Sequence, residues 1–279
     1  MFLEIIVSTL IVAQVEPSTP PVAEPWIIAG FDGPEDVYFP EGSDVGYVSN
    51  VVGTGDELDG VGFISRIDSD GNILEREWVN GLHSPKGMRD DGTYLYVTDI
   101  LDVVQIDTAT GEIAGRIDAP GAILLNGLAI DNDGRLYAAD TRQGAIYRQT
   151  SPTMMELWPL EDTNLTSVNG LIATDESLLA LSSRTGTMIA INFQTGAVEL
   201  RAWQLGYPDG IESDGRGGHY ISDMGDRMLH RSASGEMSLI HASETPYGNN
   251  DFGINLDAGN LYVANYNRNT VTVIPLPSE

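Results

Sequence analysis

Short near-copies of one four-residue pattern recur about every forty residues, and they constrain the fold more than any other feature of the chain. Four copies carry an oxygen-bearing side chain at the second place: PEDV with Glu35, LNGL with Asn126, VNGL with Asn169 and PDGI with Asp209. Two more copies align without one, PKGM with Lys86 and DFGI with Phe252. The steps between the six positions are 51, 40, 43, 40 and 43 residues, which is the period of a four-stranded propeller blade.

The rest of each repeat favours strands. After the motif comes a turn rich in Asp, Asn and Gly, and then an apolar run such as LYVTD, LYAAD or LYVAN. No window of a dozen residues holds a helical apolar period. The last repeat ends after three strands at about Pro275, while the segment from Trp26 to Gly30 precedes the first motif. We therefore predict an all-β chain, a six-bladed β-propeller closed by this N-terminal strand, which pairs with Thr270 to Ile274.

The N-terminal residues differ from the repeats. Residues 1–13 are an apolar run too short to span a bilayer, and they predict an export signal, although no Lys or Arg precedes the run and Glu4 interrupts it. Residues 14–25 form a Pro-rich linker, and residues 26–279 form one propeller domain. We expect a periplasmic or secreted protein, with a cytoplasmic one as the alternative and a frayed arm or extra strand as the alternative role of the segment.

Composition limits the partners and the chemistry. The 279 residues carry 41 Asp and Glu against 14 Lys and Arg, a formal net charge of −27. Such a surface repels nucleic acid and anionic lipid, so we expect neither nucleic acid nor membrane as a partner once the signal is removed. Solubility is the first explanation of this charge. The chain has no cysteine, which excludes disulfides, thiolate metal sites and a cysteine nucleophile. We expect a monomer.

The repeat positions predict a metal site. If the repeats surround an axis, their equivalent positions converge on it, and two carboxylates and two carboxamides then point at one place. Carboxylate and amide oxygens suit one hard divalent cation, with calcium first and magnesium, manganese or zinc as alternatives. An Asn or Asp before Gly is also a common turn dipeptide, but this explanation must account for four of six equivalent positions. The predicted ligands are Glu35, Asn126, Asn169 and Asp209.

These motifs resemble a known family. PEDV, PKGM, LNGLAID, VNGL and PDGIESDGRGG, with GFISRID and NNDFGIN, are similar to segments of the senescence marker protein, gluconolactonase and luciferin-regenerating enzyme group, over residues 33–275. The resemblance implies a six-bladed propeller with a divalent metal held at the four matching positions, and hydrolysis of lactones. One departure is Gly127, where the group often has Asp after the Asn. It puts the substrate contacts of that blade in doubt.

Further side chains are candidates for chemistry. Asp209 is the candidate general base, because a carboxylate can bind a metal through one oxygen and accept a proton on the other. A nearby cation lowers its basicity, so a neighbouring carboxylate is a rival. In an up-and-down blade the second strand ends on the face where the motif begins, although Asp at a strand end is usually a turn former. The candidates for substrate binding are Lys86, Asp99, Asp140, Asp223 and Asp251.

Two function classes remain open. The first is a metal-dependent hydrolase of a small lactone or ester, gluconolactonase-like. The second is a non-catalytic propeller with a structural metal that binds a sugar, peptide or protein partner. The surplus of the first repeat, GTGDELDGVG at residues 53–62, falls on the motif face and is a candidate lid. There is no G-x-S-x-G elbow and no paired His spacing, which disfavours a serine hydrolase.

Overall fold

The computed structural model describes residues 24–160, 165–243 and 249–277. Over these residues the chain is built of strands, with one short 3-10 helix, η1 (Tyr266–Arg268). The predicted export signal, residues 1–13, and most of the linker lie outside the described residues. No helix in the described ranges is long and apolar enough to cross a membrane.

The strands follow one another in antiparallel runs of four. A separate strand, β1 (Trp26–Ala29), precedes the runs. The first run is β2 (Pro34–Tyr38), β3 (Val45–Asn50), β4 (Gly62–Asp68) and β5 (Ile73–Leu82), and the second is β6 (Pro85–Asp90), β7 (Tyr94–Asp99), β8 (Asp102–Asp107) and β9 (Ile113–Asp118). The next two runs are β10 (Leu125–Ile130), β11 (Leu136–Asp140), β12 (Ala145–Ser151), β13 (Met154–Leu157), β14 (Val168–Ala173), β15 (Ser177–Ser182), β16 (Thr187–Asn192) and β17 (Val198–Ala202). The last are β18 (Pro208–Ser213), β19 (His219–Asp223), β20 (Arg227–Arg231), β21 (Met237–Ala242), β22 (Asn249–Asn255), β23 (Asn260–Asn265) and β24 (Thr270–Pro275).

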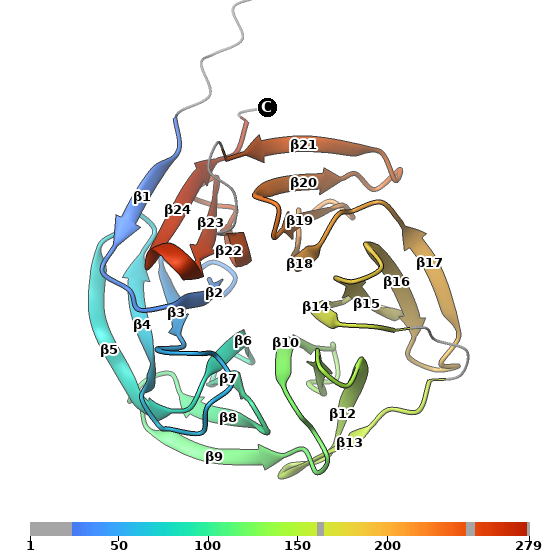
Figure 1. The fold of residues 1–279 in the computed structure, drawn as a ribbon, viewed down its shortest axis with the longest axis horizontal. Helices are drawn as coiled ribbons and strands as arrows, with labels where there is room; N and C mark the ends of the chain where they lie inside the picture. Colours follow the sequence, from blue (N-terminus) through green and yellow to red (C-terminus); the bar gives the residue numbers. More distant parts are fainter. Residues whose placement is uncertain (1–23, 161–164, 244–248, 278–279) are drawn as a thin grey trace, which may run out of the picture.

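These runs form a propeller-like ring. The first strand of each run lies nearest the axis, and these inner strands contact one another in the closed order β2, β6, β10, β14, β18, β22 and back to β2 (Figure 1). Hydrogen bonding gives five sheets, because the runs β6 to β9 and β10 to β13 join through one parallel pair, Met154 with Asp118. The all-β, propeller-like fold is therefore confirmed. The count of six separate blades stays a prediction, since two runs share a sheet.

The apolar core is divided among the gaps between neighbouring runs. One cluster joins Ile64 and Val79 of the first run to Met88 and Leu95 of the second. The other clusters of buried apolar side chains likewise lie between successive runs, and the last run packs on the first. The second strands of the runs are buried along almost their whole length, as β7 and β11 are, so each sheet packs against a sheet on both sides. Closing the ring provides both neighbours for every run.

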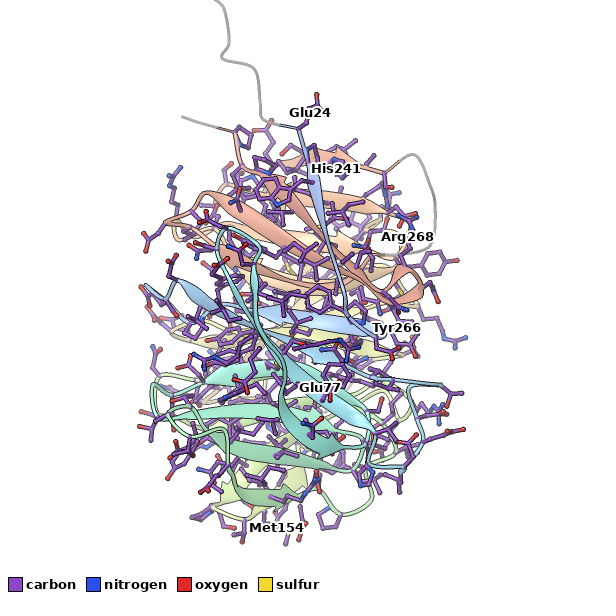
Figure 2. All side chains as sticks on the ribbon, turned by 90° about the vertical axis from the view of Figure 1, so that its left-hand side faces the viewer. Glu24, Glu77, Met154, His241, Tyr266 and Arg268 are labelled. Atoms are coloured by element: carbon purple, nitrogen blue, oxygen red, sulfur yellow. The ribbon has the colours of Figure 1, made fainter. Side chains whose placement is uncertain are left out.

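The N-terminal strand closes the last sheet, as predicted. β1 pairs antiparallel with β24, from Trp26 with Val273 to Ala29 with Thr270. Its Ile28 is buried against Val271 and Val273. Figure 2 shows the molecule from the side, with Glu24 leading into this strand. The strand removes the open edge of β24, which would otherwise offer unpaired backbone groups to another chain.

Deleting residues 1–30 should therefore expose β24 and give an aggregating protein with a lower melting temperature. The matched control is deletion of residues 1–23, which keeps β1 and should stay soluble with an unchanged melting temperature. Light scattering and thermal unfolding of both proteins check the prediction. A soluble protein of unchanged melting temperature after the longer deletion would show that β1 does not protect the edge.

Candidate functional site

The inner strands share a bulge that sets the position of the motif side chains. In β2, Pro34 pairs with Asn50 and Val37 pairs with Val48, so the two residues between Pro34 and Val37 are skipped. The same irregularity occurs in every other inner strand. We call the first skipped residue the ring position. In chain order it is occupied by Glu35, Lys86, Asn126, Asn169, Asp209 and Asn250.

The last ring position corrects the sequence prediction, which placed Phe252 there. β22 pairs Asn249 and Phe252 with β23 and skips Asn250 and Asp251, so Phe252 corresponds to Val37 and is fully buried in the apolar layer. The prediction was wrong by two residues because DFGI ends in Gly-Ile, as PDGI does, and so aligns with that motif in sequence. Pairing instead aligns NNDF with PEDV, and both have Asp at the third place. Asn250 is thus a ring residue that sequence reasoning missed.

Apart from half-buried Asn250, the ring side chains are buried, and the charged ones lie within one another's electrostatic field. Glu35 is 5% and Asp209 is 3% exposed. Burial raises the pKa of Glu35 to about 7, although the nearby Lys86 ammonium acts to lower it. Burial also raises the pKa of Asp209 well above its usual range, and the charges of Glu35 and Asp251 add to the shift. Carboxylates from three different inner strands therefore form one cluster.

Direct contacts link members of this cluster across neighbouring strands. The amide nitrogen of Asn169 donates to Oδ1 of Asp209. A hydrogen bond with Asn126 opposes the rise in the pKa of Glu35, but Oε2 of Glu35 is buried without a hydrogen-bond partner. A buried carboxylate oxygen without a partner costs free energy unless a cation or water supplies one. A cation or a water at Oε2 of Glu35 would therefore stabilise the cluster.

Lys86 is the cation among the ring residues. It is buried, and Nζ donates to Oγ of Ser84 at 3.1 Å. Its charge acts to lower the pKa of both Glu35 and Asp209, so it lies inside the predicted site. Together with Arg89, this ammonium lies among five buried carboxylates, which are Glu35, Asp36, Asp209, Glu212 and Asp251. Negative charge is therefore in excess around the axis when all of these groups are ionised.

Asp251 also belongs to the cluster, at the second bulge position of β22. Burial raises its pKa to about 6, while the guanidinium of Arg89 acts to lower it. Its equivalent in the first run is Asp36, which is buried and accepts a hydrogen bond from the Met88 amide at 2.8 Å. Burial and the charge of Asp251 raise the pKa of Asp36. The structure therefore places Asp251 directly after the ring position, and its predicted contact with substrate stays a prediction.

The Arg89 side chain crosses the channel axis next to the ring residues, on the side of the far ends of the inner strands. Its guanidinium, on β6, donates to the Leu171 carbonyl of β14 at 3.3 Å and forms a 2.8 Å ion pair with Glu212 of β18. It also lies over the Tyr38 ring of β2, 5.4 Å from the centroid. Burial raises the pKa of Glu212 to about 7 against the effect of Arg89. The ion pair thus links strands on opposite sides of the ring and fills the channel at this level.

The remaining second bulge positions are glycines that have no room for a side chain. A Cβ added to Gly127 would lie 2.1 Å from the Asn169 carbonyl oxygen, and one added to Gly170 would lie 2.3 Å from that of Asp209. Atoms cannot approach so closely. Packing therefore requires glycine at position 127, where the senescence marker protein group often has Asp. No acidic side chain from that position reaches the site.

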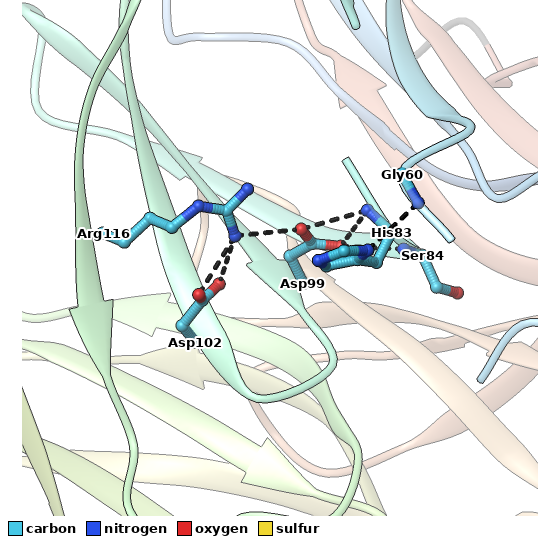
Figure 3. Close-up of polar contacts among 6 residues, drawn as sticks. All are labelled: Gly60, His83, Ser84, Asp99, Asp102 and Arg116. Atoms are coloured by element: carbon cyan, nitrogen blue, oxygen red, sulfur yellow. Dashed lines mark hydrogen bonds and ion pairs between the residues drawn. The ribbon is translucent and has the colours of Figure 1, made fainter. Parts of the chain in front are cut away.

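Asp99, Asp140 and Asp223, predicted as substrate contacts, have a structural role. Asp99 accepts hydrogen bonds from the amides of His83 and Ser84 at 2.7–3.1 Å and pairs with Arg116 (Figure 3). Asp140 accepts from the amides of residues 123, 124 and 143 at 2.6–3.3 Å, and Asp223 from those of residues 207 and 225 at 2.8 and 3.2 Å. These carboxylates hold the loops that lead into the inner strands, as strand-end turn formers do.

The surplus segment of the first run lies over one side of the ring. Gly53 accepts a hydrogen bond from the Tyr266 hydroxyl at 2.7 Å, and Gly60 donates to Nδ1 of His83 at 3.1 Å. A Cβ added to Gly55 would lie 3.8 Å from Nζ of Lys86. Asp56 forms an ion pair with Arg142 of the third run. The segment is therefore tied to the first three runs and the last, beside the ring cation.

A separate cavity of about 610 Å³ lies at the other mouth of the channel. It is lined by the far ends of the inner strands, including Tyr38, Arg89, Glu212 and Leu256. Arg89 and Glu212 separate it from the ring residues. Within the described ranges, no group of three or more His, Asp or Glu side chains is arranged to hold a metal ion. The ring set instead mixes carboxylates with amides.

Comparisons with known proteins establish the fold only. No protein-family model matches the chain, and no curated protein matches it in sequence. Among solved structures it is similar to a streptogramin B lyase, with a TM-score of 0.65 at 14% identity over 91% of this chain and 97% of that one. It is also similar to a catalytically inactive virginiamycin B lyase from Staphylococcus aureus with quinupristin, with a TM-score of 0.62 at 12% identity over 91% of this chain and 100% of that one.

A third similar structure is that of a nidogen/laminin complex, with a TM-score of 0.66 at 17% identity over 78% of this chain and 87% of that one. These neighbours are propeller-like, which agrees with the ring of inner strands. Similarity at such identities shows the architecture of this chain but neither its activity nor its partners. Membership of the senescence marker protein group stays a prediction.

The structural role of the strand-end carboxylates can be tested at Asp140. Asp140→Ala should destabilise the fold by about 2–4 kcal/mol, because three backbone amides lose a charged acceptor. Metal affinity, measured by calorimetry on the folded protein, should change less than threefold. The control is Glu176→Ala, an exposed carboxylate, which should leave urea unfolding unchanged. A soluble Asp140→Ala protein of normal stability with lost ligand binding would restore its predicted role in substrate binding.

Proposed function

We propose that this chain is a divalent-metal-dependent hydrolase of lactones or related esters. The observation that carries the proposal is the burial of two carboxylates and two amides at equivalent positions of one ring, with Oε2 of Glu35 left without a partner. Oxygen donors of this kind, with negative charge in excess, suit calcium, magnesium or manganese. The motif resemblance and the lyases among similar structures support a catalytic propeller. We propose six blades, with the eight-stranded sheet as two adjoining blades.

The ring residues fit a cation, with one rearrangement. Glu35, Asn126, Asn169 and Asp209 would hold it, calcium first. Because Asn169 now presents its amide nitrogen to Asp209, this amide must turn over to offer its oxygen. A bound ion would polarise the substrate carbonyl and stabilise the oxyanion that follows. Asn250, at the sixth ring position, would face the same space.

Residues of the chain supply the other steps. Asp209 would accept the proton of the attacking water, since its carboxylate is the one that combines burial with the contact to Asn169. Lys86 would bind the carboxylate of the product acid from its place beside Glu35. Asp251 is the rival base. Asp99, Asp140 and Asp223 are weaker rivals because backbone amides already occupy their oxygens.

The alternative is a binding propeller with a structural ion. The cavity of about 610 Å³ at the far mouth favours it, since it can take a sugar, a peptide or part of a protein partner. A panel of aldonolactones and alkyl-substituted lactones, with calcium, magnesium, manganese or zinc and with chelator, separates the two. Chelator-sensitive hydrolysis supports the hydrolase. No hydrolysis with any of these metals makes the binding function the better one. Export and a monomeric state remain part of the proposal.

Removing either charged ligand should abolish metal binding. Asp209→Ala and Glu35→Ala each delete a charge that the site cannot replace, so calcium affinity should fall by more than about a hundredfold, whereas Asn126→Ala should weaken it less. Calorimetry on the three variants measures this, with exposed Glu75→Ala as the control. Chelator should also lower the melting temperature of the wild type, because an ion at a hundredfold excess over its Kd stabilises the folded state by about 2.7 kcal/mol. Equal affinity in all variants would reject the four ligands.

The role of Asp209 as base is tested by Asp209→Asn. An amide oxygen can still coordinate a metal, but an amide cannot accept the proton. With metal at saturation, kcat should fall about a hundredfold to ten-thousandfold, far more than metal affinity falls. The parallel variant Asp251→Asn should keep most of the turnover. Near-normal kcat for metal-saturated Asp209→Asn would make Asp209 a ligand only and direct the search to Asp251.

A further inference from the structure

Large apolar side chains are exposed on the loops of the ring face. Leu58, Leu101, Ile123, Tyr207, Val61 and Met224 are 36–62% exposed. All six lie in connections at the end of the strands where the ring positions are, and we call them the collar. Trp203, 64% exposed, lies in the same connection as Tyr207 but directly follows the outermost strand β17, and we leave it out of the collar. Loops of the opposite face contribute only Leu256 among the described residues, and the remaining large exposed apolar residues lie on outermost strands. Exposed apolar loop residues are therefore concentrated on the face where the ring positions lie.

The collar is close in the chain to the proposed reacting groups. Tyr207 lies two residues before Asp209, and Ile123 three residues before Asn126. Their amides donate to Asp223 at 2.8 Å and to Asp140 at 2.6 Å, so their backbone is held in place. Asp140 and Asp223 therefore position these two residues of the collar.

The surplus segment brings the rest of the collar toward the ring. Leu58 and Val61 belong to it, at 58% and 49% exposure. Its contacts with His83 and Tyr266 fix it beside Lys86. Leu58 and Val61 are therefore held on the ring face, on the side of the first two runs. Exposed apolar side chains thus lie on the face at which the buried, charged ring residues are found.

We propose that the substrate of the ring site is a lactone or ester with an apolar alkyl or aryl substituent, which packs on the collar while the carbonyl lies at the ring. The proposal rests on the proposed function and narrows its substrate class. A polyhydroxylated sugar lactone would need hydrogen-bond partners around its hydroxyls, and the collar offers apolar surface instead. The net charge of −27 opposes an anionic membrane as the occupant.

The test is a series of γ-lactones with unbranched alkyl substituents of two to ten carbons, compared with aldonolactones. For the metal-loaded wild type, kcat/KM should rise about two- to fourfold for each added methylene and exceed that for aldonolactones. In Tyr207→Ala and Ile123→Ser this dependence on chain length should flatten. The control is Leu239→Ser, an equally exposed residue on the outermost strand β21, whose chain-length dependence should match the wild type.

A second measurement separates this inference from the proposed function. Alkyl lactams of the same lengths are not hydrolysed readily, and calorimetry on the metal-loaded protein measures their binding. Chain-length-dependent binding that Tyr207→Ala weakens supports the collar even if no lactone is turned over. Lactone hydrolysis without any chain-length dependence would overturn the collar and keep the hydrolase. Loss of binding to neutral-lipid vesicles in Tyr207→Ala, with unchanged lactam binding, would overturn it too.

Discussion

The close approach of neighbouring inner strands is the constraint on which the site depends. At Gly127 and Gly170 the next strand's carbonyl oxygen occupies the space of a side chain, at 2.1 and 2.3 Å from an added Cβ. Strands this close to one another leave a narrow channel, so the ring residues of distant repeats must share it. Glycine at the second bulge position therefore determines that carboxylates more than 170 residues apart in sequence, Glu35 and Asp209, lie in one electrostatic field.

Crowding and burial together explain why a bound cation would stabilise the cluster. Removing a carboxylate from water disfavours its charge, and a second carboxylate nearby disfavours it further. Both effects act on Asp209, and burial alone outweighs Lys86 at Glu35. The free-energy cost of burying a carboxylate is not offset by a hydrogen bond at Oε2 of Glu35, which has no partner in the protein. Such a cost at buried positions is more common at functional sites than at sites that serve stability alone.

Sequence periodicity predicted the strands, the closing strand and five of the ring positions, because a repeat of fixed length reports equivalent places directly. It misplaced the sixth because a turn-like Asp-Phe-Gly run imitates the motif, whereas the register depends on which residues of β22 pair with β23. For Asp99, Asp140 and Asp223 it predicted substrate contact beside the common role of a turn former, since a strand-end carboxylate has the same sequence signature in both. The bonded amides show that all three hold loops, and their contact with substrate stays a prediction.

The two mouths of the channel are not equivalent, and the difference gives the site a direction. Arg89 reaches from β6 to β14 and to Glu212 on β18, so an ion pair with its own hydrogen bonds fills the channel below the ring. A molecule in the far cavity meets this pair before it meets Glu35 or Asp209. Under the proposed function a substrate would therefore reach the ring from the loop face, where the surplus segment lies beside Lys86. That face also carries the collar, so this approach to the charged centre runs past exposed apolar side chains.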